Sequence, residues 1–106
     1  MTAPLESSVI AGILKYLRTL DECHAEKTHS GGWGNSGKPD IDACFRGRAV
    51  KLECKRTYQQ QPTAIQIQNL KRWRAAGAVA EVVRSVDEVK EIIDALIAGR
   101  YEPKPL

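Results

Sequence analysis

The sequence predicts an α/β fold in which helices flank a mixed four-stranded sheet, with the elements in the order αβββαβα. Three observations support this prediction. Apolar residues recur at intervals of three and four in three segments, as in helices that pack on one face. Two adjacent segments alternate between apolar and polar residues, as strands do, and a short apolar run lies between two helical segments. A chain of 106 residues is long enough for one modest core, so we expect residues 1–106 to form a single domain.

The first helix is predicted over residues 4–20. Its apolar positions share one face: Leu5, Val9, Ile10, Ile13, Leu14, Leu17 and Leu20. Glu6 lies on the same face, because its spacings to several of these residues are helical. A glutamate is usually avoided on a buried face unless it is paired. Glu6 therefore either stabilises the helix N-terminus, where an acid suits the helix dipole, or reaches a functional site.

A short strand is predicted over residues 23–28, and a glycine-rich loop follows over residues 29–37. Loops of this composition often hold ligands when they lie beside a site. Trp33 is the unusual residue of this loop. Three roles fit it: stacking on a nucleic-acid base, wedging at a DNA junction, or anchoring the loop to the core.

A β-hairpin is predicted next, with its turn at Gly47. Apolar and polar residues alternate on both sides of the turn, so the polar faces of the two strands lie beside each other. Pro39 has no N–H to donate, which suits the first residue of a strand. Pro39 therefore marks where the strand starts and fixes the position of Asp40 in it. The pairing brings Asp40, Glu53 and Lys55 together at one end of the hairpin.

This convergence suggests a metal site. Two carboxylates a few ångströms apart repel each other unless a divalent cation lies between them, and hard oxygen ligands suit magnesium or manganese. Lys55 lies roughly 6.5–7 Å beyond Glu53 on the same strand face, within reach of a water or a phosphate oxygen. Two acids and a lysine in this arrangement are typical of metal-assisted phosphodiester hydrolysis. The alternative is an ordinary cross-strand charge pair at the surface.

A polar connection over residues 57–62 leads to the second predicted helix, residues 63–76, which ends at Gly77. Thr63 and Gln66 have the spacing of a capping box. A helix N-terminus that faces the site also favours a phosphate, so Gln66 can serve both the cap and the site.

Basic residues follow the same helix beside Trp73: Lys71, Arg72 and Arg74. They form either a solvated face or a patch that contacts the DNA backbone.

The fourth strand is predicted over residues 78–84. A helix connects it to the third strand, so the two should be parallel with a right-handed crossover. Ser85 and Glu88 have capping-box spacing and open a last helix that ends near Gly99. Residues 101–106 contain two prolines and are expected to form a loose tail.

Composition limits the functional classes. The net charge of +3 permits binding to nucleic acid without requiring it. No apolar run approaches membrane-spanning length and the N-terminus lacks the features of a signal peptide, so no membrane partner is expected. Cys23, Cys44 and Cys54 are odd in number and lack the paired spacing of zinc ligands. They are typical of reduced, mostly structural thiols in an intracellular protein.

Pro39-Asp40 followed at hairpin distance by Glu53-Cys54-Lys55 resembles the signature of the PD-(D/E)xK nuclease superfamily. The fuller pattern is similar to its virus-type replication–repair nuclease branch, the VRR-NUC domain. The further matching positions are Ala25-Glu26-Lys27, Gly37-Lys38, Leu52, Gln66, Gly77 and Val82-Val83-Arg84-Ser85. The resemblance extends from Glu6 to about Ile97, which implies a stand-alone domain with a restriction-endonuclease-like core.

The resemblance also implies roles for the site residues. Asp40, Glu53 and the main-chain carbonyl of Cys54 would bind Mg²⁺ or Mn²⁺, and Glu6 would hold a water of the metal or a second ion. Lys55 would orient or help to deprotonate the attacking water. Gln66 would position Lys55 or the phosphate.

The expected function is therefore a metal-dependent, structure-selective endodeoxyribonuclease that acts on branched DNA in the manner of a Holliday-junction resolvase. Replication and DNA repair of a phage or mobile element, in the bacterial or phage-infected cytoplasm, would be the setting. The alternatives are a nicking, flap or restriction-type nuclease on other DNA, or a DNA-binding module without catalysis. The residues expected to contact DNA are Lys38, Trp33, Arg56, Lys71 and Arg72.

A homodimer is expected as well, because a four-way junction is resolved by two cuts related by two-fold symmetry and two-fold dimers are the commonest assembly. Val79, Val82 and Ile93 are the apolar residues that we expect at its contact surface.

Overall fold

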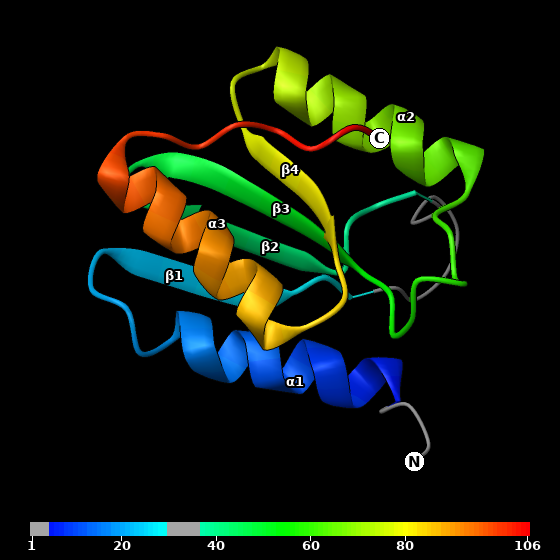
Figure 1. The fold of residues 1–106 in the computed structure, drawn as a ribbon, viewed down its shortest axis with the longest axis horizontal. Coiled ribbons are helices and arrows are strands. Elements are labelled where there is room, and N and C mark those ends of the chain that lie inside the picture. The colour runs from blue at the N-terminus through cyan, green and yellow to red at the C-terminus, as the bar shows by residue number, and fades with distance from the viewer. Residues whose placement is uncertain (1–4, 30–36) are drawn as a thin grey trace.

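The computed structural model of the protein describes residues 5–29 and 37–106. Its four strands form one sheet in the order β1-β2-β3-β4, in which β3 and β4 are parallel and the other two pairs are antiparallel. The predicted order αβββαβα is confirmed (Figure 1). The elements are α1 (Glu6–Leu17), β1 (Cys23–Lys27), β2 (Ile41–Phe45), β3 (Arg48–Cys54), α2 (Ala64–Ala75), β4 (Val79–Val83) and α3 (Val86–Ala98).

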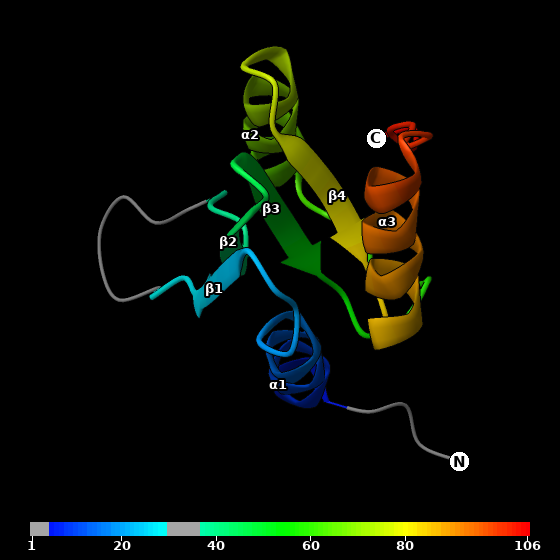
Figure 2. The ribbon, with the colours of Figure 1, turned by 90° about the vertical axis from the view of Figure 1, so that its left-hand side faces the viewer.

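The main core lies between one face of the sheet and the helices α1 and α3, whereas α2 covers the opposite face (Figure 2). Its buried residues include Val9, Ile13, Leu17, Ala25, Ile41, Phe45, Leu52, Val79, Val89 and Ile93. The predicted alternation explains this arrangement, because every second residue of β3 points into this core. The remaining β3 residues point toward α2, yet Lys51 and Glu53 are buried there too. The strand that carries the predicted site is therefore covered on both faces.

The helix ends agree with the capping signals, with one difference. Thr63 and Gln66 form the complete capping box at the start of α2. At the start of α3, Ser85 Oγ accepts a hydrogen bond from Glu88 N, but the Glu88 carboxylate does not return to Ser85. It accepts instead from Arg84 N and from the Tyr58 hydroxyl, both at 2.5 Å. A tertiary contact has thus replaced half of the local motif.

The C-terminal segment 101–106 has no secondary structure, but the prediction of a loose tail is wrong. The Tyr101 hydroxyl donates a hydrogen bond to Glu81 Oε2, and Lys104 N donates to the same oxygen at 3.4 Å. Arg74 of α2 donates to the Lys104 carbonyl at 2.8 Å. Buried Glu81 is a fixed acceptor for this segment, which therefore crosses back toward α2 (Figure 1).

The three apolar residues expected at a dimer surface are mostly core residues. Val79 and Ile93 are 0% and 1% exposed, because β4 and α3 pack against each other and against the rest of the sheet. Only Val82 is partly exposed. The predicted contact surface is therefore wrong for Val79 and Ile93.

Within the described ranges, none of the helices has the length and apolar character needed to cross a membrane.

Candidate active site

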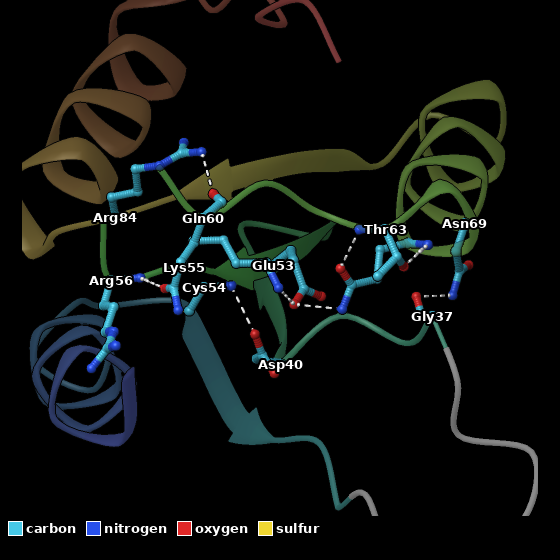
Figure 3. Close-up of polar contacts among 11 residues, drawn as sticks. Gly37, Asp40, Glu53, Cys54, Lys55, Arg56, Gln60, Thr63, Asn69 and Arg84 are labelled. Atoms are coloured by element: carbon cyan, nitrogen blue, oxygen red, sulfur yellow. Dashed lines mark hydrogen bonds and ion pairs between the residues drawn. The ribbon is translucent and has the colours of Figure 1, made fainter. Parts of the chain in front are cut away.

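Four polar residues converge where β2 begins and β3 ends (Figure 3). Asp40 directly precedes β2, and Gln66 lies in the first turn of α2. Glu53 lies at the end of β3, and Lys55 directly follows that strand. Lys55 Nζ is 3.7 Å from Glu53 Oε1, and Gln66 Nε2 donates a hydrogen bond to the same oxygen at 3.2 Å. Asp40 Oδ2 accepts a hydrogen bond from Cys54 N at 2.8 Å. The hairpin and the helix thus assemble one site from residues that are up to 26 positions apart, Asp40 and Gln66 being the extremes.

Strand register explains why the Cys54 carbonyl is available to a ligand. Ile41 pairs with Leu52, so the register continued by two residues sets Pro39 opposite Cys54. Proline has no N–H to donate to the Cys54 carbonyl. The N–H and C=O of an extended residue point to the same edge, and Cys54 N points to Asp40. Its carbonyl therefore faces the site, beside the Asp40 carboxylate.

Glu53 is the electrostatically unusual residue of the site. It is 2% exposed, and among the residues that the structure describes its Oε2 atom is buried without a hydrogen-bond partner. Burial, the neighbouring Asp40 carboxyl and the charge of Glu6 raise the pKa of Glu53 to about 8, while Lys55 lowers it. A buried carboxylate oxygen without a partner costs free energy, which a bound cation would remove.

The residues present fit a hard divalent cation. Two carboxylates and one main-chain carbonyl would supply oxygen ligands, which magnesium and manganese prefer. In ranges 5–29 and 37–106 no three His, Cys, Asp or Glu side chains group as a ready-made metal site, so the carbonyl and solvent would complete the coordination. The Cys54 thiol is unsuited to this task, since it is fully buried in the main core and burial raises its pKa.

Glu6 and Gln66 differ in how closely they approach the carboxylates. Glu6 is half-buried at the start of α1, and its negative charge contributes to the raised pKa of Glu53. It is thus near the site without a hydrogen bond to it among the described residues. Gln66 serves the cap and the site together: its Oε1 accepts from Thr63 N at 2.8 Å while its Nε2 contacts Glu53. Its partner in the site is Glu53, whereas Lys55 or the phosphate was expected.

Asn69 was missed by the sequence analysis. Its Nδ2 donates to the Gly37 carbonyl at 2.7 Å, which ties α2 to the chain just before Asp40. Gly37 has φ +84°, and a Cβ at this position would lie 2.4 Å from Ile65 Cγ2. The close approach therefore requires glycine here. The available signal was spacing: Asn69 follows Gln66 by three residues and shares its helix face.

Arg84 organises the segment after Lys55, which the sequence suggested only as a polar connection. Its Nε donates to the Thr57 carbonyl at 2.9 Å, and its Nη2 donates to the Gln60 carbonyl at 3.1 Å. The Gln60 side chain in turn accepts from Arg56 N at 3.1 Å. Figure 3 shows Arg84, Gln60 and Arg56 on the Lys55 side of the site. The backbone that follows Lys55 is thus held by a side chain from the end of β4.

The residues expected to contact DNA lie in different settings. Lys38 and Arg56 are exposed and adjoin Asp40 and Lys55 in the chain, and Lys71 and Arg72 are exposed on α2. Trp33 lies outside the described residues. Arg74 is not free for a phosphate, because its guanidinium is engaged by Ala80, Glu81 and Lys104.

Comparison with known proteins finds solved structures that are similar to this chain over most of its length. No family model and no curated protein matches the chain. A solved structure described as "VRR_NUC domain" is 27% identical with a TM-score of 0.70, over 84% of this chain and 94% of that chain. Another, described as "VRR_NUC domain protein", has a TM-score of 0.72 over 92% of this chain and 91% of that chain; at 18% identity it supports the fold alone. The chain therefore has the restriction-endonuclease-like fold and resembles VRR-NUC domains over most of its length, which supports a nuclease-type domain.

Proposed function

We propose that this protein is a metal-dependent endodeoxyribonuclease that hydrolyses phosphodiester bonds in branched DNA. The observation that carries the proposal is the Asp40–Glu53 pair, in which a buried Glu53 oxygen lacks a protein partner among the described residues. A folded protein seldom retains such an oxygen unless a ligand satisfies it. A buried carboxyl group with a second carboxylate and a lysine beside it is also the setting in which perturbed pKa values indicate catalysis.

Asp40, Glu53 and the Cys54 carbonyl would hold one Mg²⁺ or Mn²⁺ ion, and Glu6 would hold a water of that ion. When bound, the ion supplies Lewis-acid polarisation of a phosphoryl oxygen and neutralises negative charge. Gln66 keeps the Glu53 carboxylate in one orientation through the bond to Oε1. Cys54 N does the same for Asp40. Preorganised ligands of this kind lower the reorganisation needed during the reaction.

Lys55 is the residue that we assign to the attacking water. Its side chain is 14% exposed and its ammonium lies beside Glu53, so its position is fixed by the strand and by an opposite charge. From there it orients the water and neutralises charge that develops on the phosphate. The water oxygen bonds to phosphorus and the bond from phosphorus to the leaving sugar oxygen breaks. The proton of the attacking water passes to solvent, and the leaving sugar oxygen takes up a proton from solvent to become a hydroxyl.

Branched DNA is the substrate class suggested by the family resemblance, in replication and repair of a phage or mobile genome. Exposed Lys38 and Arg56 adjoin the site and would contact backbone phosphates on either side of the cleaved bond. Two symmetric cuts in a junction require two sites, which a two-fold homodimer supplies. Ile65 of α2 and Ile97 of α3 are 56% and 51% exposed. Because these helices lie on opposite faces of the sheet, each residue is a separate candidate for the contact surface.

The test is cleavage of end-labelled four-way junction, flap and linear duplex DNA in magnesium, with the wild type, Asp40→Asn and the exposed-carboxylate control Asp94→Asn. We expect paired cuts in the junction by the wild type and by Asp94→Asn, and none by Asp40→Asn. Cleavage by Asp40→Asn at the wild-type rate would refute the site. Preferential cutting of the flap or the linear duplex would support a nuclease, but one with flap or nicking activity rather than junction resolution.

A further inference from the structure

A cavity of about 320 Å³ lies beside the proposed active site, between α2 and the start of β2. Its volume is at the lower end of the range for small-ligand sites, about 300–1,000 Å³. The residues of its wall that matter here are Thr28, Pro39, Asp42, Lys51, Asn69 and Trp73. The proposed mechanism uses none of them to bind the metal or the water. We call this cavity the α2 pocket.

The α2 pocket is continuous with the catalytic residues. Pro39 directly precedes Asp40 in the chain, and Asn69 lies one helical turn after Gln66, whose amide contacts Glu53. Thr28 N donates to the Asp40 carbonyl at 2.8 Å, so the opposite wall is also tied to the site. A group in the pocket is therefore adjacent to a phosphate at the carboxylates.

The chemistry of the pocket combines an apolar wall with a paired donor and acceptor. Lys51 bonds to Asp42 Oδ1, and its ammonium lies 4.0 Å from the centre of the Trp73 ring. The Lys51 side chain is 11% exposed, whereas that of Asp42 is 56% exposed. An ammonium has three protons and a carboxylate two oxygens, so each group keeps hydrogen-bonding capacity after pairing. A donor beside an acceptor matches the edge of a nucleobase, and the aromatic and proline surfaces match its apolar faces.

We propose that the α2 pocket binds one unpaired nucleobase next to the cleaved phosphate. The proposal rests on the nuclease function proposed above and adds a reason for preferring irregular DNA. A stacked base inside a duplex cannot enter a pocket unless it is unpaired and turned out, which costs a few kcal/mol. An already unpaired base at a branch, bulge or flap avoids this cost. The pocket thus recognises a feature that branched DNA has and a regular duplex lacks.

The experiment compares three end-labelled DNAs: a duplex with one unpaired adenosine, the same duplex with an abasic residue in its place, and a fully paired duplex. Affinities are measured in a chelating buffer, so that no cleavage occurs. We expect the wild type to prefer the unpaired adenosine over both other DNAs by about tenfold, the effect of one stacked base. Thr28→Phe, which fills the pocket and keeps the backbone N–H, should bind all three DNAs equally.

Two further variants separate this effect from unfolding. Ala11→Phe introduces the same side chain at an exposed position of α1 outside the pocket and should retain the preference. Lys51→Met removes the donor but keeps an unbranched side chain against Trp73, and should also lose the preference. It tests the pocket even if Thr28→Phe does not fold. Thermal melts establish which variants are folded.

Cleavage of the same DNAs in magnesium, run in parallel, separates the two proposals. Equal wild-type affinity for the adenosine and abasic bulges, or an intact preference in folded Thr28→Phe and Lys51→Met, would overturn the pocket proposal. If the DNA is still cleaved in that case, the nuclease function is supported and the pocket proposal alone is wrong. A base preference without cleavage of these DNAs or of the four-way junction would support the pocket and refute the nuclease function.

Discussion

Glu53 and Glu81 are two glutamates buried in adjacent strands, at 2% and 1% exposure, with opposite surroundings. Glu81 points toward the α3 side of β4, and its Oε1 accepts from Arg74 Nη2 at 2.8 Å. Its Oε2 accepts from the Tyr101 hydroxyl and from Lys104 N. Glu53 points toward α2, has an unpartnered Oε2 within the described chain, and lies beside a second carboxyl group.

This difference distinguishes a structural acid from a functional one. Both glutamates follow an apolar residue in a strand, so the local pattern treats them alike. Burial alone does not distinguish them either. What differs is the hydrogen bonding of the carboxylate oxygens. Protein donors occupy both oxygens of Glu81, whereas Oε2 of Glu53 has no partner among the described residues and is open to a ligand. Burial and the bond to Glu81 also raise the pKa of Tyr101, which keeps its hydroxyl as a donor to the glutamate.

The largest expected effect is on catalysis. Glu53→Gln should reduce the rate of magnesium-dependent cleavage about 10³-fold or more, because it removes a charged ligand worth several kcal/mol in the transition state. Glu81→Gln should retain the wild-type rate at a temperature where it is folded. Single-turnover cleavage of the four-way junction measures both. Equal losses in the two variants would contradict the distinction between the glutamates.

Stability should show the reverse order. Glu81→Ala leaves Arg74 and Tyr101 without their shared acceptor and should lower the free energy of unfolding by about 3–5 kcal/mol. Glu53→Gln should cost little in the metal-free protein, since it removes a carboxylate that the site does not satisfy. Urea unfolding of both variants, with Asp94→Ala as an exposed control, tests this. A Glu81→Ala protein as stable as the wild type would contradict the assignment.

The pH dependence follows from the raised pKa of Glu53, which is about 8 in the folded protein against 4.5 for an ordinary glutamate. The folded state therefore binds the proton more tightly than the unfolded state. This contribution to stability is complete below about pH 4.5 and is lost as the pH rises through about 8. Its size is on the order of a few kcal/mol. Urea unfolding without metal should show the loss in the wild type, and a much smaller one in Glu53→Gln.

Magnesium should stabilise the protein through Asp40 and Glu53. At a concentration 100 times Kd the gain is about 2.7 kcal/mol, seen as a higher Tm. Asp40→Asn should lose most of this gain, whereas Glu81→Gln, which leaves the site intact, should keep it. Differential scanning calorimetry with and without magnesium measures the change in Tm for each variant. A gain in Asp40→Asn as large as in the wild type would place the ion elsewhere.

The smallest expected effect is on DNA affinity. Lys55→Ala should abolish cleavage but change the affinity for junction DNA by only a small factor, because spread phosphate contacts supply much of the binding. Fluorescence anisotropy in a chelating buffer measures it, and Lys104→Ala serves as a control at an exposed lysine away from the site. Affinity lost in proportion to activity would make Lys55 an anchoring residue rather than one that acts on the water.

The element order, the faces of the strands and the meeting of Asp40, Glu53 and Lys55 could be predicted from the sequence alone. These features depend on local periodicity, on a tight turn and on a proline that starts a strand, all of which act over a few residues. The capping box of α2 was equally local, and its contact with Glu53 followed once the helix was placed.

Which polar groups find hydrogen-bond partners far along the chain could not be predicted, because it depends on how the elements pack. The partners of Glu81 lie 7 to 23 residues away, those of Arg84 lie 24 and 27 away, and Asn69 is 32 from Gly37. No short-range pattern encodes such contacts, because they arise when separate elements pack. For the same reason the sequence suggested a loose tail at 101–106 and a surface role for Val79 and Ile93. Burial and hydrogen bonding depend on what the rest of the chain places around a residue, and that is known only after folding.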